Sequence, residues 1–383
     1  MLTYDAAIIG GGIIGSSLAW ELARNKLRVV VLDRQQPGRE ASWAAAGILS
    51  PAPESPAAFP MVPLGRASLA LYPEFVAAIE EDSGENAGFR PKGTLQTFFA
   101  RDAERELSTL MALHHGLGLA AEALRIEDAR ELEPALSAEV LAAALRPEEA
   151  SVDNRALTRG AILAAQRAGA EFRSGRQVTR LLREGDRCTG VVAAGEAIAA
   201  STVVLAAGCF SGEIAGVSRY APVRPARGQM VALRAPSVPI ERVLWSERVY
   251  IVPRNDGRLV AGSTVEYAGF EKGLTPAGLQ EILSAAMEIA PTLKDAAIEE
   301  TWSGLRPDSP DHLPILGPTD LEGLLVATGH FRNGILLAPI TAKLIREWII
   351  GQGVSIDWEA FSPMRFLAAQ RAAEEHTQKH QSH

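Results

Sequence analysis

A glycine pattern, Gly10-x-Gly12-x-x-Gly15, lies between two short apolar segments near the start of the chain. Tyr4–Ile9 is the apolar segment before it, and residues 27–32 after it are almost wholly aliphatic, as buried parallel strands are. The residues between the glycines and the second segment have the apolar spacing of a helix. This strand–turn–helix–strand order predicts a dinucleotide-binding unit of the Rossmann type.

Each glycine of this pattern has its own physical reason. Gly10 permits the tight turn, Gly12 lets a pyrophosphate approach the backbone, and Gly15 lets the helix pack closely on the strand. The pyrophosphate would lie at the helix N-terminus, where free N–H groups and the helix dipole favour an anion. Asp33 ends the second apolar segment and is placed to accept hydrogen bonds from the ribose hydroxyls of adenosine.

Charge and composition exclude several classes of function. The chain has 38 Lys and Arg against 46 Asp and Glu, and the resulting net charge of −8 disfavours nucleic acid as a partner. Two cysteines cannot build a disulfide framework, and no Cys-x-x-Cys or His-Glu-x-x-His spacing indicates a metal. The most apolar stretch, residues 191–212, is interrupted by Gly195-Glu196 and by Ser201-Thr202, which favours buried strands over a membrane span. No basic leader precedes the first strand, so we expect a cytoplasmic protein that binds neither membranes, metals nor nucleic acid.

The remainder of the chain predicts an α/β protein with two domains. Residues 222–235, 242–253 and 257–264 look antiparallel, and an Asp-Gly turn joins the last two. Other predicted strands are at 93–100, 171–182, 188–200, 202–206 and 324–328, and predicted helices are at 16–25, 66–82, 102–115, 155–168, 274–289 and 335–350. We expect a nucleotide-binding domain from residues 1–84, 150–218 and 301–365, a second domain from 85–149 and 219–300, and a disordered tail at 371–383.

A single dinucleotide pattern limits the chemistry. The stretch Ala206-Ala-Gly208 has the wrong spacing to be a second one. If the one site holds FAD, electrons must come directly from an organic substrate, as in an oxidase or a dehydrogenase, and not from NAD(P)H.

Five segments in chain order resemble the glycine oxidases of thiamine biosynthesis, in the FAD-dependent D-amino-acid oxidase superfamily. They are Ala7–Gly15, Glu40–Gly47, Tyr250–Arg254, Trp302–Pro307 and Gly329–Pro339, and the resemblance runs from about residue 4 to 350. It implies a Rossmann-type FAD domain with a parallel sheet and a substrate domain with a mixed, mainly antiparallel sheet. It also implies oxidative deamination of glycine, and of sarcosine or small D-amino acids, with molecular oxygen as the acceptor and release of hydrogen peroxide. Finally, the resemblance implies a homo-oligomer such as a tetramer and transfer of the imine product to a thiazole synthase.

The resemblance also implies which residues contact the cofactor. The row Ala44–Gly47 has side chains small enough for a flat ring to lie against its backbone. The segment Gly329–Gly334 opens a helix whose dipole would stabilise negative charge on reduced flavin, although His330 there could equally be structural. The full set is Gly10, Gly12, Ile13, Ile14, Gly15, Asp33, Ser42, Ala45, Ala46, Gly47, Ile48, Val178, Gly208, Gly329, His330, Phe331, Arg332, Asn333, Gly334 and Ile335. The loop 307–314 has no cysteine where sarcosine oxidases attach their flavin, so we expect FAD to be non-covalent.

An amino-acid substrate needs its carboxylate fixed, and the planar fork of an arginine suits that group. By resemblance the catalytic and substrate-binding residues are Tyr250, Arg306 and Arg332, with Arg306 and the Tyr250 hydroxyl on the carboxylate. Strand alternation would put Arg248 on the same face as Tyr250, adding a cation at the pocket.

The mechanism expected from these residues needs no dedicated base. The amine binds neutral, hydride passes from Cα to flavin N5, and the imine hydrolyses to glyoxylate and ammonia. Two alternatives stay open at this stage. One is a glycine or D-amino-acid dehydrogenase with a different electron acceptor, similar to hydrogen cyanide synthase. The other is a flavin-dependent tRNA-modifying protein, which the negative charge disfavours.

Overall fold

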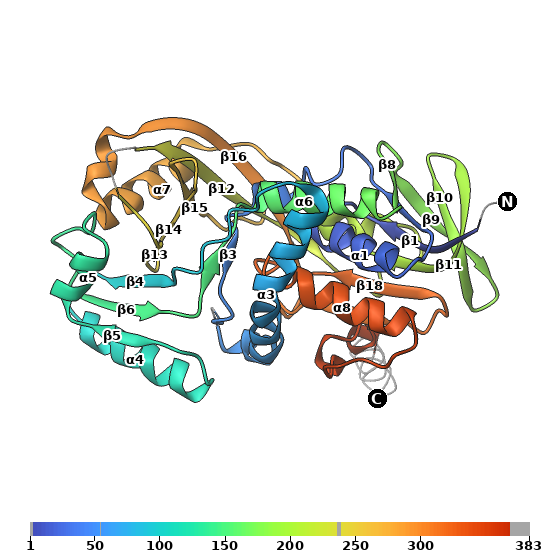
Figure 1. Ribbon diagram of the computed structural model, residues 1–383, viewed down its shortest axis with the longest axis horizontal. Helices are drawn as coiled ribbons and strands as arrows, with labels where there is room; N and C mark the ends of the chain where they lie inside the picture. The colour runs from blue at the N-terminus through green and yellow to red at the C-terminus, as the bar shows by residue number, and fades with distance from the viewer. Residues whose placement is uncertain (1–2, 54, 236–238, 368–383) are drawn as a thin grey trace, which may run out of the picture.

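The computed structural model describes residues 3–53, 55–235 and 239–367, and they form two eight-stranded sheets that lie side by side along the long axis (Figure 1). The tail predicted at 371–383 lies outside the described residues. A short two-stranded ladder joins the halves, with β3 (Ile48–Leu49) antiparallel to β7 (Ala150–Ser151).

The first sheet contains the predicted nucleotide-binding strands. Its main strand order is β17-β18-β11-β1-β2-β8, and β10 extends it by pairing with both β11 and β9. The pairs from β18 through β11, β1 and β2 to β8 are parallel, which confirms the Rossmann-type arrangement. The strands are β1 (Tyr4–Ile9), β2 (Val29–Leu32), β8 (Glu171–Arg173), β9 (Val178–Glu184), β10 (Arg187–Ala193), β11 (Glu196–Leu205), β17 (Ile315–Pro318) and β18 (Leu324–Thr328).

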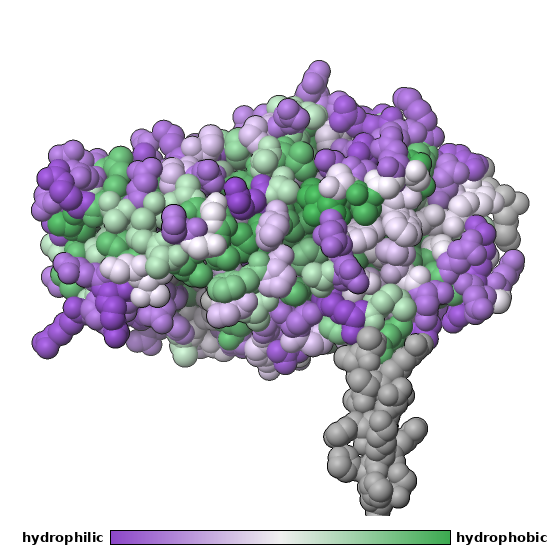
Figure 2. All heavy atoms as spheres, turned by 90° about the horizontal axis from the view of Figure 1, so that it is seen from below, coloured by the Kyte–Doolittle hydropathy of each residue, from purple (hydrophilic) through white to green (hydrophobic). Residues whose placement is uncertain are grey.

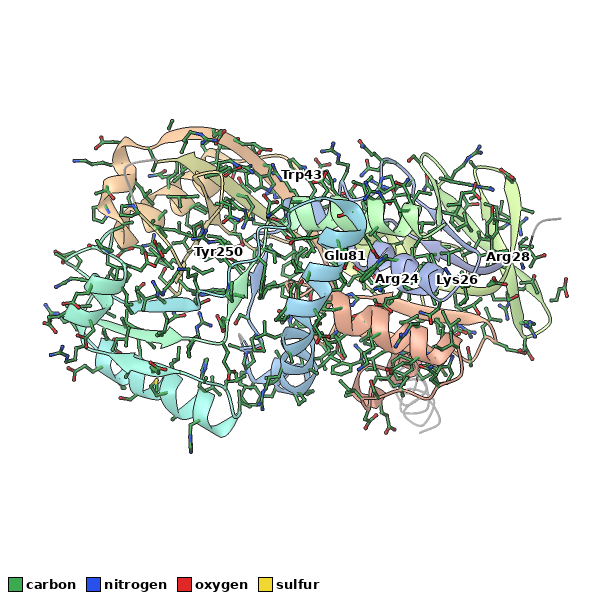
Figure 3. The ribbon with its side chains drawn as sticks, in the orientation of Figure 1. Arg24, Lys26, Arg28, Trp43, Glu81 and Tyr250 are labelled. Atoms are coloured by element: carbon green, nitrogen blue, oxygen red, sulfur yellow. The ribbon has the colours of Figure 1, made fainter. Side chains whose placement is uncertain are left out.

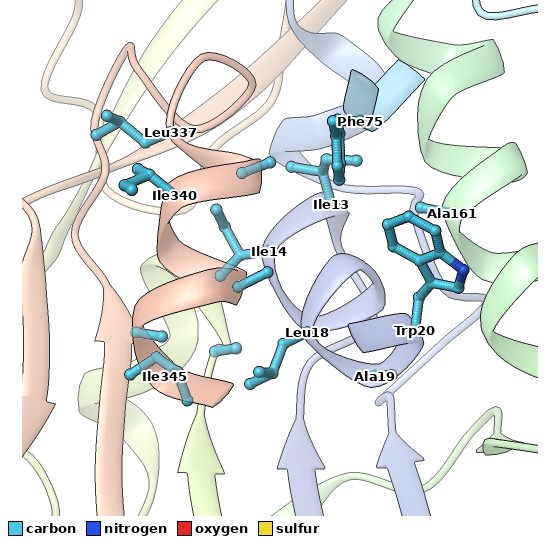
Figure 4. Close-up of a cluster of buried hydrophobic side chains, with 14 of the residues drawn as sticks. Ile13, Ile14, Leu18, Ala19, Trp20, Phe75, Ala161, Leu337, Ile340 and Ile345 are labelled. Carbon is cyan, nitrogen blue, oxygen red and sulfur yellow. The ribbon is translucent and has the colours of Figure 1, made fainter. Parts of the chain in front are cut away.

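Four helices pack against one another beside this sheet. They are α1 (Ile13–Arg24), α3 (Val62–Ser83), α6 (Asn154–Arg167) and α8 (Ala338–Ile349). Figure 4 shows apolar side chains of α1 between α8 on one side and α3 with α6 on the other, with Ile14 and Leu18 toward Ile340 and Ile345. Complete burial of a leucine such as Leu18 contributes about 1.5–3 kcal/mol, so this layer fixes the start of α1 against the sheet.

The second sheet is mainly antiparallel, in the order β16-β12-β15-β14-β13-β4-β6-β5, and only β13 and β4 pair in parallel. Its strands are β4 (Thr94–Phe98), β5 (Glu122–Leu124), β6 (Ala142–Arg146), β12 (Arg224–Arg234), β13 (Val243–Trp245), β14 (Tyr250–Pro253), β15 (Arg258–Gly262) and β16 (Ala297–Asp308). The remaining elements are α2 (Ala41–Ala44), α4 (Ala103–Gly116), α5 (Ile126–Leu132), α7 (Pro276–Ile289) and 3-10 turns at Pro56–Met61, Gly208–Glu213, Pro291–Asp295 and Glu359–Phe361. The predicted mixed, mainly antiparallel sheet is confirmed.

Several predicted boundaries are wrong for identifiable reasons. The pair Ser201-Thr202 does not break a strand, because β11 runs through it: its first half pairs with β10 and its second half with β1 and β18. The strand predicted at 171–182 is two strands, β8 and β9, and the one at 242–253 is divided by a turn in which Ser246 N donates to Val249 O. Strand β16 was not predicted, and the expected domain boundary at residue 301 falls inside it, although all of β16 pairs within the second sheet.

The surface seen in Figure 2 is hydrophilic at both ends of the molecule and carries hydrophobic residues mainly across its middle. Large exposed apolar side chains include Leu141, Tyr267, Ile298 and Trp348. Within the described ranges, no helix combines the length and the apolar character that crossing a bilayer requires.

Candidate cofactor and substrate site

One cavity of about 620 Å³ reaches from the first sheet to the second. At one end it meets the carboxyl ends of parallel strands, through Ile9 at the end of β1, Leu32 at the end of β2 and Ala327 on β18. Open α/β sheets bind ligands at this edge, and the volume is in the range of cofactor sites.

The glycine turn forms the floor at that end. Gly10 has a φ of +104°, and a Cβ there would lie 2.4 Å from Ala206 O. A Cβ on Gly15 would lie 2.0 Å from Gly10 O, so Gly15 permits the close packing of helix on strand and does not itself line the cavity. Gly12 precedes α1 without a side-chain cap, so the first-turn N–H groups of Ile14 and Gly15 are available to an anion.

Asp33 is held at the end of β2 with both oxygens oriented. Its Oδ2 accepts from Gly11 N at 2.8 Å and its Oδ1 from Gln35 N at 2.9 Å. Ser42 Oγ accepts from Ile13 N at 2.9 Å and so joins the start of α1 to α2. The donor and acceptor set at this end fits the pyrophosphate and ribose of a dinucleotide, because it offers backbone N–H groups beside the Asp33 carboxylate.

The row of small residues forms one wall in the middle of the cavity. Ala44, Ala45, Ala46 and Gly47 all line it. Gly47 has a φ of +75°, and a Cβ there would lie 2.1 Å from Val152 O, so only glycine fits. A wall of backbone and methyl groups leaves room for a flat ring, as the sequence predicted.

The segment after β18 forms another wall and departs from the predicted helix. Helix α8 begins at Ala338, not at residue 335, because turns closed by Asn333 N to His330 O and Leu337 N to Asn333 O intervene. His330 is buried, its Nε2 lies 3.1 Å from Thr341 Oγ1, and burial lowers its pKa to about 3, so it is neutral. Gly329 turns the chain with a φ of +70° behind this wall.

The far end of the cavity belongs to the second sheet. Arg306 on β16 donates from Nη1 to Thr264 O at 3.1 Å and from Nη2 to Ser263 Oγ at 2.5 Å. Tyr250 on β14 directs its hydroxyl toward Met230 Sδ at 3.6 Å, and its ring lies 5.4 Å from that of Trp245. All of these side chains line the cavity except Thr264, and Figure 3 shows Tyr250 well inside the second half, away from Trp43 at the junction.

The structure brings most of the predicted site residues into this one cavity. Tyr250, Arg306 and Arg332 line it together. The predicted cofactor residues that line it are Gly10, Gly12, Ile13, Ile14, Asp33, Ser42, Ala45, Ala46, Gly47, Ile48, Val178, Gly208, His330, Phe331, Arg332, Asn333, Gly334 and Ile335.

The position predicted for Arg248 is wrong. It lies in the turn before β14, where strand alternation does not apply, and its Nη1 pairs with Glu288 Oε2 of α7 at 2.8 Å. Arg248 therefore contributes no cation to the cavity lining.

Comparison with known proteins identifies the family. The model of a family described as FAD dependent oxidoreductase matches residues 5–348. The chain belongs to this family. It is 39% identical over 372 residues to the bifunctional protein ThiO/ThiG of Synechocystis sp., which covers 95% of this chain and 54% of that protein. It is 32% identical to a glycine oxidase of Geobacillus kaustophilus, covering 95% of this chain and 97% of that one.

A solved structure supports the same assignment. The crystal structure of glycine oxidase from Geobacillus kaustophilus matches with a TM-score of 0.90 at 31% identity, covering 95% of this chain and 99% of that chain. The chain spans about half the length of the bifunctional relatives that it matches. As an FAD dependent oxidoreductase, it has its dinucleotide pattern at one end of the cavity and an arginine and a tyrosine at the other.

Sequence patterns missed several residues of this FAD dependent oxidoreductase cavity. Met230 and Gly228 on β12, Trp245 on β13 and Ser263 after β15 line its far end. Each is a single residue in or just after an ordinary strand, so no local pattern indicates it. The pairing of β16, β12, β15, β14 and β13 in the second sheet brings them together. No group of three or more His, Cys, Asp or Glu side chains suited to a metal ion occurs in the part of the chain that the structure describes.

Proposed function

We propose that the protein is an FAD-dependent oxidase that deaminates glycine and other small amino acids in thiamine biosynthesis. The observation that carries the proposal is the single cavity with an oriented aspartate and glycine turn at one end and Arg306 with Tyr250 at the other. The relatives named glycine oxidase and ThiO/ThiG support the substrate class.

Under this proposal the first sheet and its helices hold the cofactor. Asp33 would bind the adenosine ribose, the start of α1 the pyrophosphate, and Ala44–Gly47 with His330–Ile335 would enclose the ring system. The second sheet would then be the substrate domain, including all of β16. We infer non-covalent binding, because Cys188 is buried outside the cavity and burial raises the pKa of the Cys209 thiol to about 12, which suppresses its thiolate.

Arg306 and Tyr250 would bind the substrate carboxylate. The guanidinium is already oriented by Thr264 O and Ser263 Oγ, so little side-chain freedom is lost when substrate arrives. Tyr250 would exchange its contact with Met230 Sδ for a stronger bond to a carboxylate oxygen. Fixing the carboxylate at two points restricts the substrate to orientations that present Cα to the cofactor.

The chemistry follows from this orientation. FAD, when bound, supplies the two-electron acceptor for hydride from the substrate Cα. The substrate becomes an imine, which water hydrolyses, so glycine, water and oxygen give glyoxylate, ammonia and hydrogen peroxide. His330 is neutral and bonded to Thr341, so it adds no positive charge to the cavity.

The apolar side chains around Tyr250 favour small substrates. Trp245 and Met230 lie beside it, and Trp245 is backed by the guanidinium of Arg146 at 5.2 Å from its ring. A bulky group on Cα would meet these side chains, whereas glycine, sarcosine and small D-amino acids would not. We also propose that the enzyme works as a homo-oligomer such as a tetramer in the cytoplasm. The fused ThiO/ThiG relatives favour transfer of the imine to a thiazole synthase.

The test is the product balance in air. Purified protein with glycine should form glyoxylate, ammonia and hydrogen peroxide in equal amounts. Glycine oxidation that proceeds with a quinone or dye but forms no peroxide would replace the oxidase with a dehydrogenase. Binding of tRNA that weakens with salt, without glycine turnover, would contradict the proposal altogether.

A further inference from the structure

Arg254 is a buried cation that the proposed mechanism does not use. It follows β14, its exposed fraction is 8%, and its guanidinium makes three hydrogen bonds. Nη1 donates to Val152 O at 3.0 Å, and Nη2 donates to Asn154 Oδ1 at 2.9 Å and to Ala46 O at 2.7 Å. Burial lowers the pKa of Arg254 to about 10, which still leaves it charged at neutral pH.

All three acceptors are neutral, which makes this burial costly. The two acidic side chains that raise its pKa, Asp153 and Asp256, are engaged by Arg258, at 3.7 and 2.7 Å. Burying a charge without a carboxylate bonded to it is unfavourable, and a neutral side chain could join the same loops at less cost. Joining the loops therefore does not explain why the buried residue at position 254 is charged.

The guanidinium lies directly behind the wall of small residues. In a trans peptide the C=O and N–H groups point in opposite directions. Because Ala46 O accepts from Arg254, the N–H of Gly47 points to the opposite side of that peptide. Trp302 Nε1 holds Ala44 O in the same way at 3.0 Å, which directs the Ala45 N–H.

Those N–H groups belong to residues that line the cavity. Among the described residues, neither Ala45 N nor Gly47 N donates a hydrogen bond to the protein. A cation bonded to a peptide oxygen polarises the peptide and strengthens its N–H as a donor. The wall thus presents donors that are made more positive by a charge on its far side.

We propose that Arg254 is a positioning residue whose buried charge, acting through the Ala46–Gly47 peptide, makes the bound flavin easier to reduce. This inference rests on the proposed function, because the cavity must hold FAD. Reduced flavin carries more negative charge than oxidised flavin, and a fixed cation in a low-dielectric site favours the more negative form. Arg254 joins the substrate domain to the cofactor wall, so one residue both fixes the wall and sets the potential of the ring against it.

The experiment compares two variants that remove the same charge from the same hairpin. Arg254→Gln keeps a donor for Ala46 O and loses the charge, and Arg258→Gln is the matched control, because Arg258 contacts Asp153 and Asp256 and not the wall. The readout is the two-electron reduction potential of the bound flavin, measured without substrate. We expect Arg254→Gln to disfavour the reduced form about tenfold, or about 30 mV, and Arg258→Gln to change it less than threefold. Equal effects of the two variants would overturn the proposal.

A second pair of variants separates charge from structure. Arg254→Lys keeps a cation and loses the fork, so it should stay within threefold of the wild-type potential while binding FAD more weakly. A tenfold effect of Arg254→Lys would show that the charge is not responsible. Should Arg254→Gln fail to fold, Arg254→Met is the neutral variant and carries the same expectation. A wild-type protein that purifies without flavin would refute the proposed function. Variants that bind flavin but leave its reduction potential unchanged would refute only the role of Arg254, so the two failures can be distinguished.

Discussion

Replacing Arg306 with alanine tests the substrate end of the cavity most sharply. Arg306 lies on β16 and its guanidinium is oriented by Thr264 O at 3.1 Å and Ser263 Oγ at 2.5 Å. It also lies across Gly228 of the adjacent strand, where a Cβ would come within 2.2 Å of Nη1. Arg306→Ala therefore removes a cation that the second sheet has positioned before substrate binds.

The magnitude follows from the partly buried position of Arg306. Truncating one partner of a buried, hydrogen-bonded charge pair costs about 2–5 kcal/mol. At about 1.4 kcal/mol for each factor of ten, kcat/KM for glycine should fall about 30-fold to several thousandfold. Flavin content should hardly change, because Arg306 is assigned to the substrate. Arg306→Lys should recover only part of the loss, since a point charge cannot reproduce the planar fork.

The assay is a double comparison of enzyme and substrate. Glycinamide lacks the carboxylate, so it should already be a poor substrate of the wild type and should lose little more with Arg306→Ala. Steady-state rates for two substrates and two enzymes give the coupling between side chain and carboxylate. Independent, additive losses would mean that Arg306 does not contact the carboxylate, and the site would have to be redrawn around Arg332.

Three further predictions concern the cofactor and the fit of Arg306. Asp33→Ala should weaken FAD binding, at about 1.5–3 kcal/mol for each charged hydrogen bond lost, and full flavin occupancy after dilution would contradict its role at the ribose. Gly228→Ala should displace the Arg306 guanidinium and lower kcat/KM for glycine about tenfold to a hundredfold. The control Gly116→Ala, whose new methyl group has no atom within 4 Å, should leave kcat/KM unchanged. Equal values of kcat/KM in the two variants would show that the contact at Gly228 is tolerated. Acid or heat should release intact FAD into the supernatant, and flavin that stays on the denatured chain would disprove non-covalent binding.

The sequence alone was sufficient to predict elements whose conformation is set by their own residues. The bounds of β1 and β18 match the predicted segments, and Gly10, Gly15 and Asp33 have the contacts that the glycine pattern required. The strand, glycine turn, helix and second strand all lie within residues 4–33, so their order can be read from the sequence, although the close approach of Ala206 O to Gly10 comes from the tertiary fold.

The sequence did not predict strand bounds correctly where the neighbouring strands of the sheet determine them. The hydroxyl residues Ser201 and Thr202 looked like a break, yet β11 continues because β10 supports its first half and β1 and β18 its second. Strand β16 begins with the stretch Ala297–Glu300, in which both apolar and acidic side chains are exposed, so no alternation marks it, and it forms because β12 pairs along almost its whole length. Arg248 was misplaced because β14 begins at Tyr250, two residues after it.

In the candidate site, too, some features could be predicted from the sequence and others depend on the tertiary fold. The small-residue row could be read from the sequence, but the side chains that fix it could not. Trp302 and Arg254 hold its carbonyl groups from 258 and 208 residues away in the chain, and Asn154 holds the carbonyl groups of Ser42 and Trp43 just before it. Such contacts are set by the tertiary fold, and a single sequence contains no spacing that indicates them.

The central claim is that this cavity lets glycine reduce a bound flavin. The most direct measurement is the visible spectrum of the purified yellow protein mixed with glycine in the absence of oxygen. We predict that the flavin absorbance bleaches and returns when air is admitted, and that Arg306→Ala at the same glycine concentration stays yellow until dithionite is added. A wild-type flavin that dithionite bleaches but saturating glycine does not would contradict the account.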